Sequence, residues 1–320
     1  MFFYISYAGH HASKAGVFQE LKSLREIRDS ASQTDDLHSA PSVSVISYGV
    51  RIGIRADAQV IIDRFLTRLP LGCKLTANGF MQRSYSIANS SGRRTKTPRQ
   101  VDLYAGDVAV GRNLSITDAL DTLEGNLQHY VAEMARQKVF VHAGVVGWKG
   151  LGVLIPGRSF AGKSTLVAEL VGAGATYYSD EYAVLDSRGL VHPFARPLGI
   201  REGRNGRTTR YPIEAFGGRA GVKPLPVALV ISSRFVRGAR WQPRKMSAGQ
   251  GALELLANTV PARRQPELSL ATLQRAASQA RFYKGNRGEA SESARWIVAL
   301  VEELTTGEGP QSSTAFQAPI

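Results

Sequence analysis

A glycine-rich segment that ends in a lysine and a hydroxyl residue is the part of this sequence best suited to chemistry. Residues 157–164, GRSFAGKS, fit the pattern G-x-x-x-x-G-K-[ST] in full. Glycine lets the backbone turn tightly, so that successive N–H groups can point at phosphate oxygens, and the start of a helix adds a positive dipole end. The segment predicts a nucleotide-phosphate site, or Walker A P-loop, formed by Gly157, Arg158, Ser159, Phe160, Ala161, Gly162, Lys163, Ser164 and Thr165.

Two side chains of this loop have predicted roles of their own. We expect Lys163 to reach the β- and γ-phosphates of ATP, and Ser164 to place its hydroxyl on Mg²⁺. The alternative is a glycine-rich turn that carries a lysine by chance. The context disfavours it, because an apolar strand (151–155) comes directly before the loop and an apolar helical pattern comes directly after it.

Two adjacent carboxylates, Asp180 and Glu181, follow the loop within an otherwise apolar segment, 175–186. A helix of about ten residues and a short turn would bring the chain back beside the loop at this point. Buried acidic groups are costly unless they meet a cation, so we expect Asp180 and Glu181 to join Ser164 in holding Mg²⁺. The alternative is that the pair lies on the solvent face of the strand, which is more favourable for Glu181 than for Asp180.

Residues 141–186 resemble the C-terminal catalytic domain of HPr kinase/phosphorylase, a family of bacterial P-loop protein kinases. The likeness rests on His142 in the segment VHAGVV, on the loop with its flanking strand and helix, and on SDE at 179–181. It implies an α/β P-loop catalytic domain that uses ATP and Mg²⁺. It also implies that Asp180 acts as the general base, that the acceptor is a serine hydroxyl, and that the chain forms homo-oligomers.

A second segment, FARPLGI at 194–200, resembles the family signature E-I-R-G-L-G-I. Arg196 agrees with the signature, and we expect it to balance charge on the transferring group. Phe194 stands where the signature has its glutamate, which argues against the reverse phosphorylase activity. The first half of the chain shows no likeness to the family's regulatory domain, so a divergent relative is expected.

His142 has two readings. A single histidine on an apolar strand is often a core residue, whereas its place in the resemblance predicts an imidazole near the γ-phosphate.

Together these residues predict an ATP-dependent kinase that acts on a Ser or Thr hydroxyl of a protein or peptide. Peptide-modification pathways contain similar kinases, so the resemblance extends to an acceptor of that kind. Two alternatives stay open. One is a small-molecule kinase acting on free serine or a sugar-like alcohol, and the other is a nucleotide-gated binding module with slow NTP hydrolysis.

The elements that must position these residues follow from the hydrophobic pattern. We expect an N-terminal helical arm and linker (1–40), an α+β domain (41–136), the P-loop kinase domain (137–305) and a flexible tail (306–320). Helices are expected at 57–69, 116–136, 163–172, 252–257, 270–282 and 290–304. Strands are expected at 43–54, 79–88, 101–111, 139–146, 150–156, 175–186 and 224–235.

The charge balance indicates the kind of partner. The chain has 40 Lys and Arg against 26 Asp and Glu, a net charge of +14, which favours acidic partners such as nucleotides or an acidic acceptor. We find no signature of specific nucleic-acid binding and no apolar run near the ~18 residues of a membrane span. With one cysteine, Cys73, the chain is expected in the cytoplasm.

An arginine recurs every third residue at Arg201, Arg204, Arg207 and Arg210. The run is either a solvated loop or a clamp for a phosphate-bearing or acidic partner.

Overall fold

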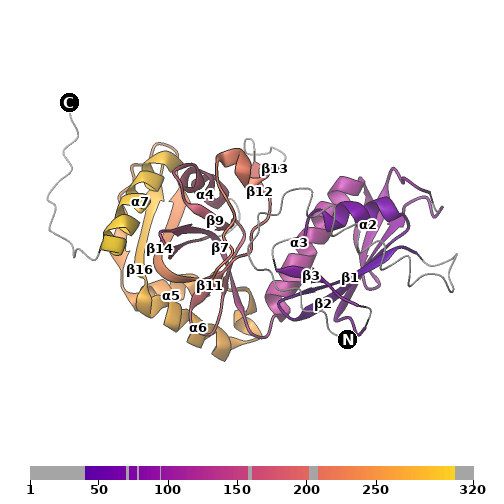
Figure 1. Ribbon diagram of the computed structural model, residues 1–320, viewed down its shortest axis with the longest axis horizontal. Helices are drawn as coiled ribbons and strands as arrows, with labels where there is room; N and C mark the ends of the chain where they lie inside the picture. The colour runs from indigo at the N-terminus through magenta and orange to yellow at the C-terminus, as the bar shows by residue number, and fades with distance from the viewer. Residues whose placement is uncertain are drawn as a thin grey trace. The chain divides into compact units, whose positions relative to one another are not determined.

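The computed structural model describes residues 40–69, 72–77, 79–93, 95–157, 161–201 and 208–306, and its fold is mixed α/β (Figure 1). From Ser42 onward, the described residues form one compact unit. Two β-sheets supply the framework of this unit, and each is covered by helices.

The first sheet has six strands in the order β3-β1-β2-β4-β5-β6. Helices α2 (Gln59–Leu66) and α3 (Ile116–Met134) pack against its buried side chains. The strands are β1 (Ser42–Ser47), β2 (Val50–Ala56), β3 (Cys73–Leu75), β4 (Arg83–Asn89), β5 (Val101–Ala105) and β6 (Val108–Leu114).

Three expectations for this region were wrong, and one of them is the single strand expected at 101–111, which is two antiparallel strands, β5 and β6. The single strand expected at 43–54 is a hairpin, because Tyr48 and Gly49 turn the chain with φ of 47° and 83° and let β1 pair with β2. The helix expected at 57–69 is shorter and spans Gln59–Leu66. The N-cap is Ala58, and Asp57 accepts a hydrogen bond from the backbone N–H of Asn89 at 2.9 Å.

Helix α3 was expected and is confirmed to within two residues. Ser115 caps it by accepting a hydrogen bond from the backbone N–H of Asp118. Its buried face carries Leu120, Leu123, Leu127 and Val131, as an amphipathic pattern requires, but the polar residues Glu124 and Gln128 lie on the same buried face.

The second sheet has eight strands, ordered β11-β10-β7-β8-β14-β16-β15, with β9 paired to β7. Strands β8, β14 and β16 run parallel, whereas β7 runs antiparallel to β8. The strands are β7 (Val139–Trp148), β8 (Leu151–Pro156), β9 (Thr176–Ser179), β10 (Tyr182–Leu185), β11 (Leu190–His192), β14 (Leu225–Phe235), β15 (Arg244–Met246) and β16 (Arg281–Arg287).

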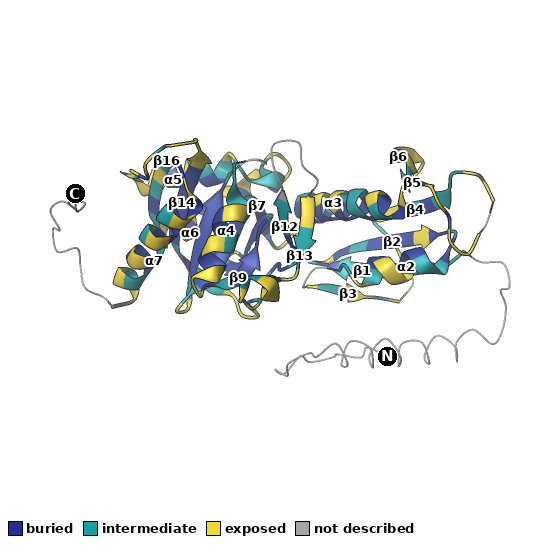
Figure 2. Ribbon diagram, turned by 90° about the horizontal axis from the view of Figure 1, so that it is seen from above, coloured by how far each residue is buried: buried dark blue, intermediate teal, exposed yellow. Residues whose placement is uncertain are grey.

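Helices cover both faces of this second sheet (Figure 2). Alternate residues of β8 point to opposite faces: Val153 and Ile155 pack with α4 (Lys163–Gly172) and α7 (Ala290–Thr306). Leu154 packs on the other face with α5 (Ala248–Leu256) and α6 (Pro266–Gln279). The strand that leads into the phosphate loop is therefore buried from both sides.

The strand expected at 175–186 is broken in two. Ser179 Oγ accepts hydrogen bonds from the backbone N–H groups of Glu181 and Tyr182, at 3.2 and 3.0 Å. These local hydrogen bonds end β9 and change the direction of the chain before β10 begins. As a result Asp180 and Glu181 occupy the break between two strands, and not the middle of one.

Three further differences concern elements near the site. The helix expected at 270–282 is α6 and ends at Gln279, and the missed strand β16 follows it. Helix α5 begins at Ala248, where Ser247 and Gln250 form a capping box. Strand β12 (Leu198–Arg201) pairs antiparallel with β13 (Thr208–Tyr211), and neither strand was expected. Strands 139–146, 150–156 and 224–235 and helices 163–172 and 290–304 are confirmed within a few residues.

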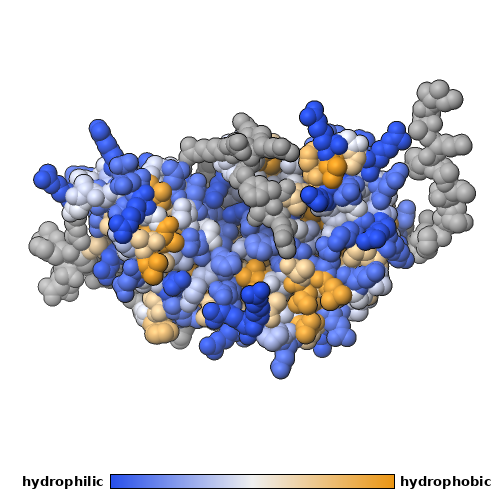
Figure 3. Space-filling view, turned by 180° about the vertical axis from the view of Figure 1, so that it is seen from behind, coloured by the Kyte–Doolittle hydropathy of each residue, from blue (hydrophilic) through white to orange (hydrophobic). Residues whose placement is uncertain are grey.

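None of the described helices is both long enough and apolar enough to cross a membrane. The face seen in Figure 3 is largely hydrophilic, with separate, smaller hydrophobic patches. This agrees with the high proportion of basic residues in the sequence.

Candidate functional site

The phosphate loop connects β8 to α4. Gly162, the N-cap of α4, has φ of 81°, a left-handed conformation that glycine adopts at little cost. Lys163 opens the helix, and its Nζ donates a hydrogen bond back to the carbonyl oxygen of Gly157 at 2.8 Å. The lysine therefore links the start of α4 to Gly157, the residue that follows β8. Arg158, Ser159 and Phe160 lie outside the described residues. Thr165 is exposed in the first turn of α4, and Ala161 is half-buried.

Asp180 lies at the other end of the loop–helix unit and is 3% exposed. Four donors converge on its carboxylate. Oδ1 accepts from Tyr177 Oη at 3.0 Å and from Arg196 Nε at 3.2 Å. Oδ2 accepts from Ser164 Oγ and from the backbone N–H of Gly199, both at 3.3 Å. The structure thus brings the loop serine and the expected acidic residue into contact.

Arg196 joins the two carboxylates. Its Nη2 donates to Glu181 Oε2 at 3.1 Å, in addition to the bond from Nε to Asp180. Nη1 donates to Gln128 Oε1 at 3.2 Å and lies 3.7 Å from Glu124 Oε1. Burial alone lowers the pKa of Arg196, but the carboxylates of Asp180, Glu181 and Glu124 raise it above its ordinary value. The guanidinium is therefore a fixed positive charge.

Glu124 and Gln128 are contacts of Arg196 that sequence reasoning missed. Both come from α3, and they are 4% and 2% exposed. The signal that could have revealed them is the spacing of two polar residues four apart on the apolar face of that helix, since buried polar groups need partners.

His142, on β7, is half-buried and not enclosed in the core. Its Nδ1 lies 3.6 Å from Glu181 Oε1, and its ring lies against Tyr182 with centroids 4.7 Å apart. Burial lowers the pKa of His142 below its ordinary value, and nearby Lys163 lowers it further, although Glu181 opposes the shift. The imidazole is therefore mainly neutral at pH 7 and can accept or relay a proton.

The pKa of Lys163 is also shifted by its surroundings. Burial lowers its pKa, and the carboxylates of Glu181 and Asp180 oppose this shift. An ammonium with that desolvation gains from a polyanion bound beside it, as a phosphate-binding lysine should.

The oxygen ligands present suit Mg²⁺. Within the described part of the chain no three His, Cys, Asp or Glu side chains gather closely enough to hold a metal alone. Mg²⁺, however, is commonly held by one or two protein oxygens together with phosphates and water. The Ser164 hydroxyl donates its hydrogen bond to Asp180, so its oxygen lone pairs remain for a cation. Ser164 and Asp180, with Glu181 nearby, would hold the ion.

Phe194, which replaces the signature glutamate, is 1% exposed. It packs against the rings of Tyr48, Phe140 and Tyr182, with centroids 5.8 to 6.0 Å apart. The position is part of an aromatic core, so it supplies no carboxylate to the site.

The arginine run is only partly described. Arg210, on β13, pairs with Glu124 and lies 3.4 Å from Asp121. It is therefore engaged within the chain. Arg204 and Arg207 lie outside the described residues, as does the side chain of Arg201.

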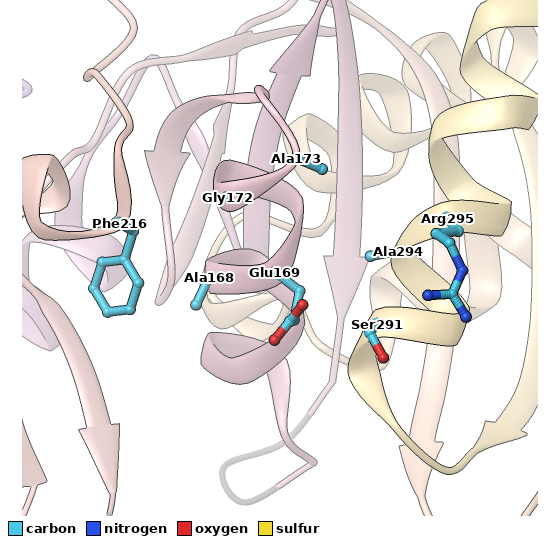
Figure 4. A pocket seen from close by; sticks show the side chains of 8 residues that line it. All are labelled: Ala168, Glu169, Gly172, Ala173, Phe216, Ser291, Ala294 and Arg295. Carbon is cyan, nitrogen blue, oxygen red and sulfur yellow. The ribbon is translucent and has the colours of Figure 1, made fainter.

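A pocket elsewhere on the surface is lined by α4, α7 and the short helix η1 (Ile213–Phe216), as Figure 4 shows. Its lining includes Glu169, Phe216, Ser291 and Arg295. Lys163, Ser164 and Asp180 do not line it, so it is separate from the candidate site.

Neither a protein-family model nor a curated protein matches this chain. Among solved structures, the chain is similar to the Hpr(Ser) kinase/phosphatase from Coxiella burnetii. The two sequences are 18% identical, and the match covers 52% of this chain and 91% of the other, with a TM-score of 0.32. The likeness is distant and assigns no role to the site residues.

Proposed function

We propose that this chain is a Mg²⁺-dependent kinase that transfers the γ-phosphoryl group of ATP to a Ser or Thr hydroxyl of a protein or peptide. One observation carries the proposal: Ser164, at the start of α4, meets Asp180, in the break between β9 and β10, at 3.3 Å. Lys163 lies within electrostatic reach of the same carboxylate. An ammonium, a hydroxyl and a carboxylate at a phosphate loop are the groups that phosphoryl transfer needs.

In the proposed reaction the acceptor oxygen attacks the γ-phosphorus, and the bond from this phosphorus to the β,γ-bridging oxygen breaks to release ADP. Asp180 accepts the hydroxyl proton. Lys163 and the loop N–H groups hold the phosphates, and Arg196 offsets negative charge near the transferring group. Mg²⁺, held by Ser164 and Asp180, would neutralise charge on the phosphates.

The four hydrogen-bond donors on Asp180 support its proposed roles as general base and Mg²⁺ ligand. They fix the position and orientation of the carboxylate, as both a base and a metal ligand require. Glu181 is more exposed, with 31% of its side chain accessible, and it faces neutral His142. Glu181 is the alternative general base. Comparing the turnover of Asp180→Asn with that of Glu181→Gln distinguishes the two carboxylates.

We further propose that residues 137–305 carry the catalysis and that residues 41–136 support it through α3. The net charge of +14 favours an acidic acceptor.

The test is transfer of label from [γ-³²P]ATP with Mg²⁺. The full chain is incubated with the proteins and peptides encoded by neighbouring genes, with free serine, or alone. Label in a protein or peptide supports the proposal. Label in phosphoserine indicates a small-molecule kinase, and label only in inorganic phosphate indicates a nucleotide-gated module. Lys163→Ala is the control, and equal labelling by this variant would exclude the loop as the source of activity.

A further inference from the structure

The carboxyl ends of three parallel strands lie together at the phosphate loop. Strand β8 runs into Gly157, while β14 ends at Phe235 and β16 ends at Arg287. The order β7-β8-β14-β16, with β9 and β10 paired to β7, places Asp180 and Glu181 on the β7 side of the loop and the ends of β14 and β16 on the other side. Ligands of parallel sheets bind beyond these carboxyl ends. The side toward β14 is therefore where a nucleotide can extend away from its phosphates.

Phe235 is an unusual residue to find exposed at this point. The five residues before Arg234 in β14 are buried, yet the side chain of Phe235 is 47% exposed. It also lies beside the loop, because a Cβ built on Gly162 would be 3.7 Å from Phe235 Cβ. An exposed aromatic ring next to a polar loop leaves apolar surface in water, and a bound aromatic group could cover it.

Arg287 contacts the ring of Phe235. The residue is 2% exposed, and its Cζ lies 5.6 Å from the centroid of the Phe235 ring. Nη2 donates to the carbonyl oxygen of Gly162 at 2.6 Å, and Nη1 donates to that of Gly288 at 3.1 Å. Nε has no hydrogen-bond partner among the described residues. The guanidinium thus links the ring to the loop, while 47% of Phe235 stays accessible.

The chain that follows Phe235 is also held in place. The backbone N–H of Val236 donates to the carbonyl oxygen of Arg287 at 2.8 Å, and Ala239 N–H donates to Val236 O at 3.0 Å. The ends of β14 and β16 are therefore tied together, so the ring is presented by a rigid part of the sheet.

We propose that the exposed ring of Phe235 is where the base of the bound nucleotide stacks. The inference rests on the proposed function, because it places the nucleoside of the nucleotide whose phosphates the loop holds. Every base has a π-face, and a purine offers the larger one, so the ligand class is a purine nucleoside triphosphate. A phenyl ring donates no hydrogen bond, so Phe235 by itself does not distinguish adenine from guanine.

The test separates the base from the phosphates. Isothermal titration calorimetry measures the affinity of the full chain for Mg²⁺–ATP and for Mg²⁺–tripolyphosphate, which has no base. We expect Phe235→Ala to weaken ATP binding about tenfold, the loss of one base–aromatic stack, and to leave tripolyphosphate binding unchanged. Phe235→Tyr keeps the ring and should retain wild-type affinity for both. Phe80→Ala removes another exposed phenylalanine, 84% accessible, outside the second sheet and should alter neither affinity.

Each other outcome overturns the inference. If Phe235→Ala binds ATP as tightly as the wild type, the base does not stack there. If it loses affinity for ATP and tripolyphosphate equally, Phe235 supports the loop and not the base. If the wild-type chain binds neither compound, the proposed function itself fails, and the inference fails with it.

Discussion

Replacing Arg196 by methionine tests how strongly its positive charge stabilises the buried carboxylates that it contacts. The guanidinium side chain is 13% exposed and bonds to Asp180, Glu181 and Gln128 at 3.1 to 3.2 Å. Methionine has a similar length and adds no polar group. The variant therefore removes the cation while keeping most of the packing.

The expected loss in the free energy of unfolding follows from the carboxylates that remain without a cation. Asp180 and Glu124 are 3% and 4% exposed, so in Arg196→Met two buried carboxylates lose a positive partner. Breaking a buried pair in this way costs about 3–5 kcal/mol. A domain with a free energy of unfolding of about 5–15 kcal/mol would remain folded but would be clearly weakened. Arg210→Met is the matched control, because Arg210 also pairs with Glu124 but is more exposed, at 28%. It should cost about 1 kcal/mol or less.

Urea unfolding at pH 7 measures both effects. Adding Glu124→Gln to Arg196→Met should recover part of the loss, because it removes one of the buried carboxylates left without a cation. A cost below about 1 kcal/mol for Arg196→Met, or no recovery in the double variant, would refute the network as described.

Three further predictions concern catalysis and acid stability. Lys163→Ala should nearly abolish ATP turnover with little change in melting temperature, and steady-state kinetics with calorimetry check this. Asp180→Asn should lower turnover about 10²–10⁴-fold with little change in ATP affinity, and Glu181→Gln should lower it less; the reverse order would make Glu181 the base. Burial raises the pKa of Asp186, but hydrogen bonds from His192 and neighbouring backbone N–H groups lower it from 3.8 to about 2. The wild type should therefore lose about 2 kcal/mol relative to Asp186→Asn as the pH falls from 3.8 to 2, measured by urea midpoints.

The parts of the site that sequence reasoning found are local ones. The loop and the first turn of α4 are contiguous, and Asp180 lies sixteen residues after Ser164, so strand, loop and helix lengths alone bring them near each other. The exact placement of Asp180 was harder to foresee. The break between β9 and β10 depends on Ser179 bonding to two backbone N–H groups, and hydrophobicity carries no sign of such bonds.

The parts that were missed depend on long-range contacts. Gln128 meets Arg196 from 68 residues away, and no periodic pattern specifies which two elements will meet. Strand β16 was missed because apolar spacing continues past the end of α6 to Phe282. The backbone of Ala280 is already extended, with φ of −102° and ψ of 149°, and pairing with β14 decides the structure there. Tertiary pairing overrides local propensity at such points.

The contacts of α3 with Arg196 constrain the evolution of this protein. Glu124 and Gln128 are encoded far from Arg196, yet all three share one buried network. A recombination event that replaced the first sheet and its helices with an unrelated segment would leave Arg196 without two of its four partners. Positions 124, 128 and 196 should therefore vary together among relatives, and the first half of the chain should be inherited with the second.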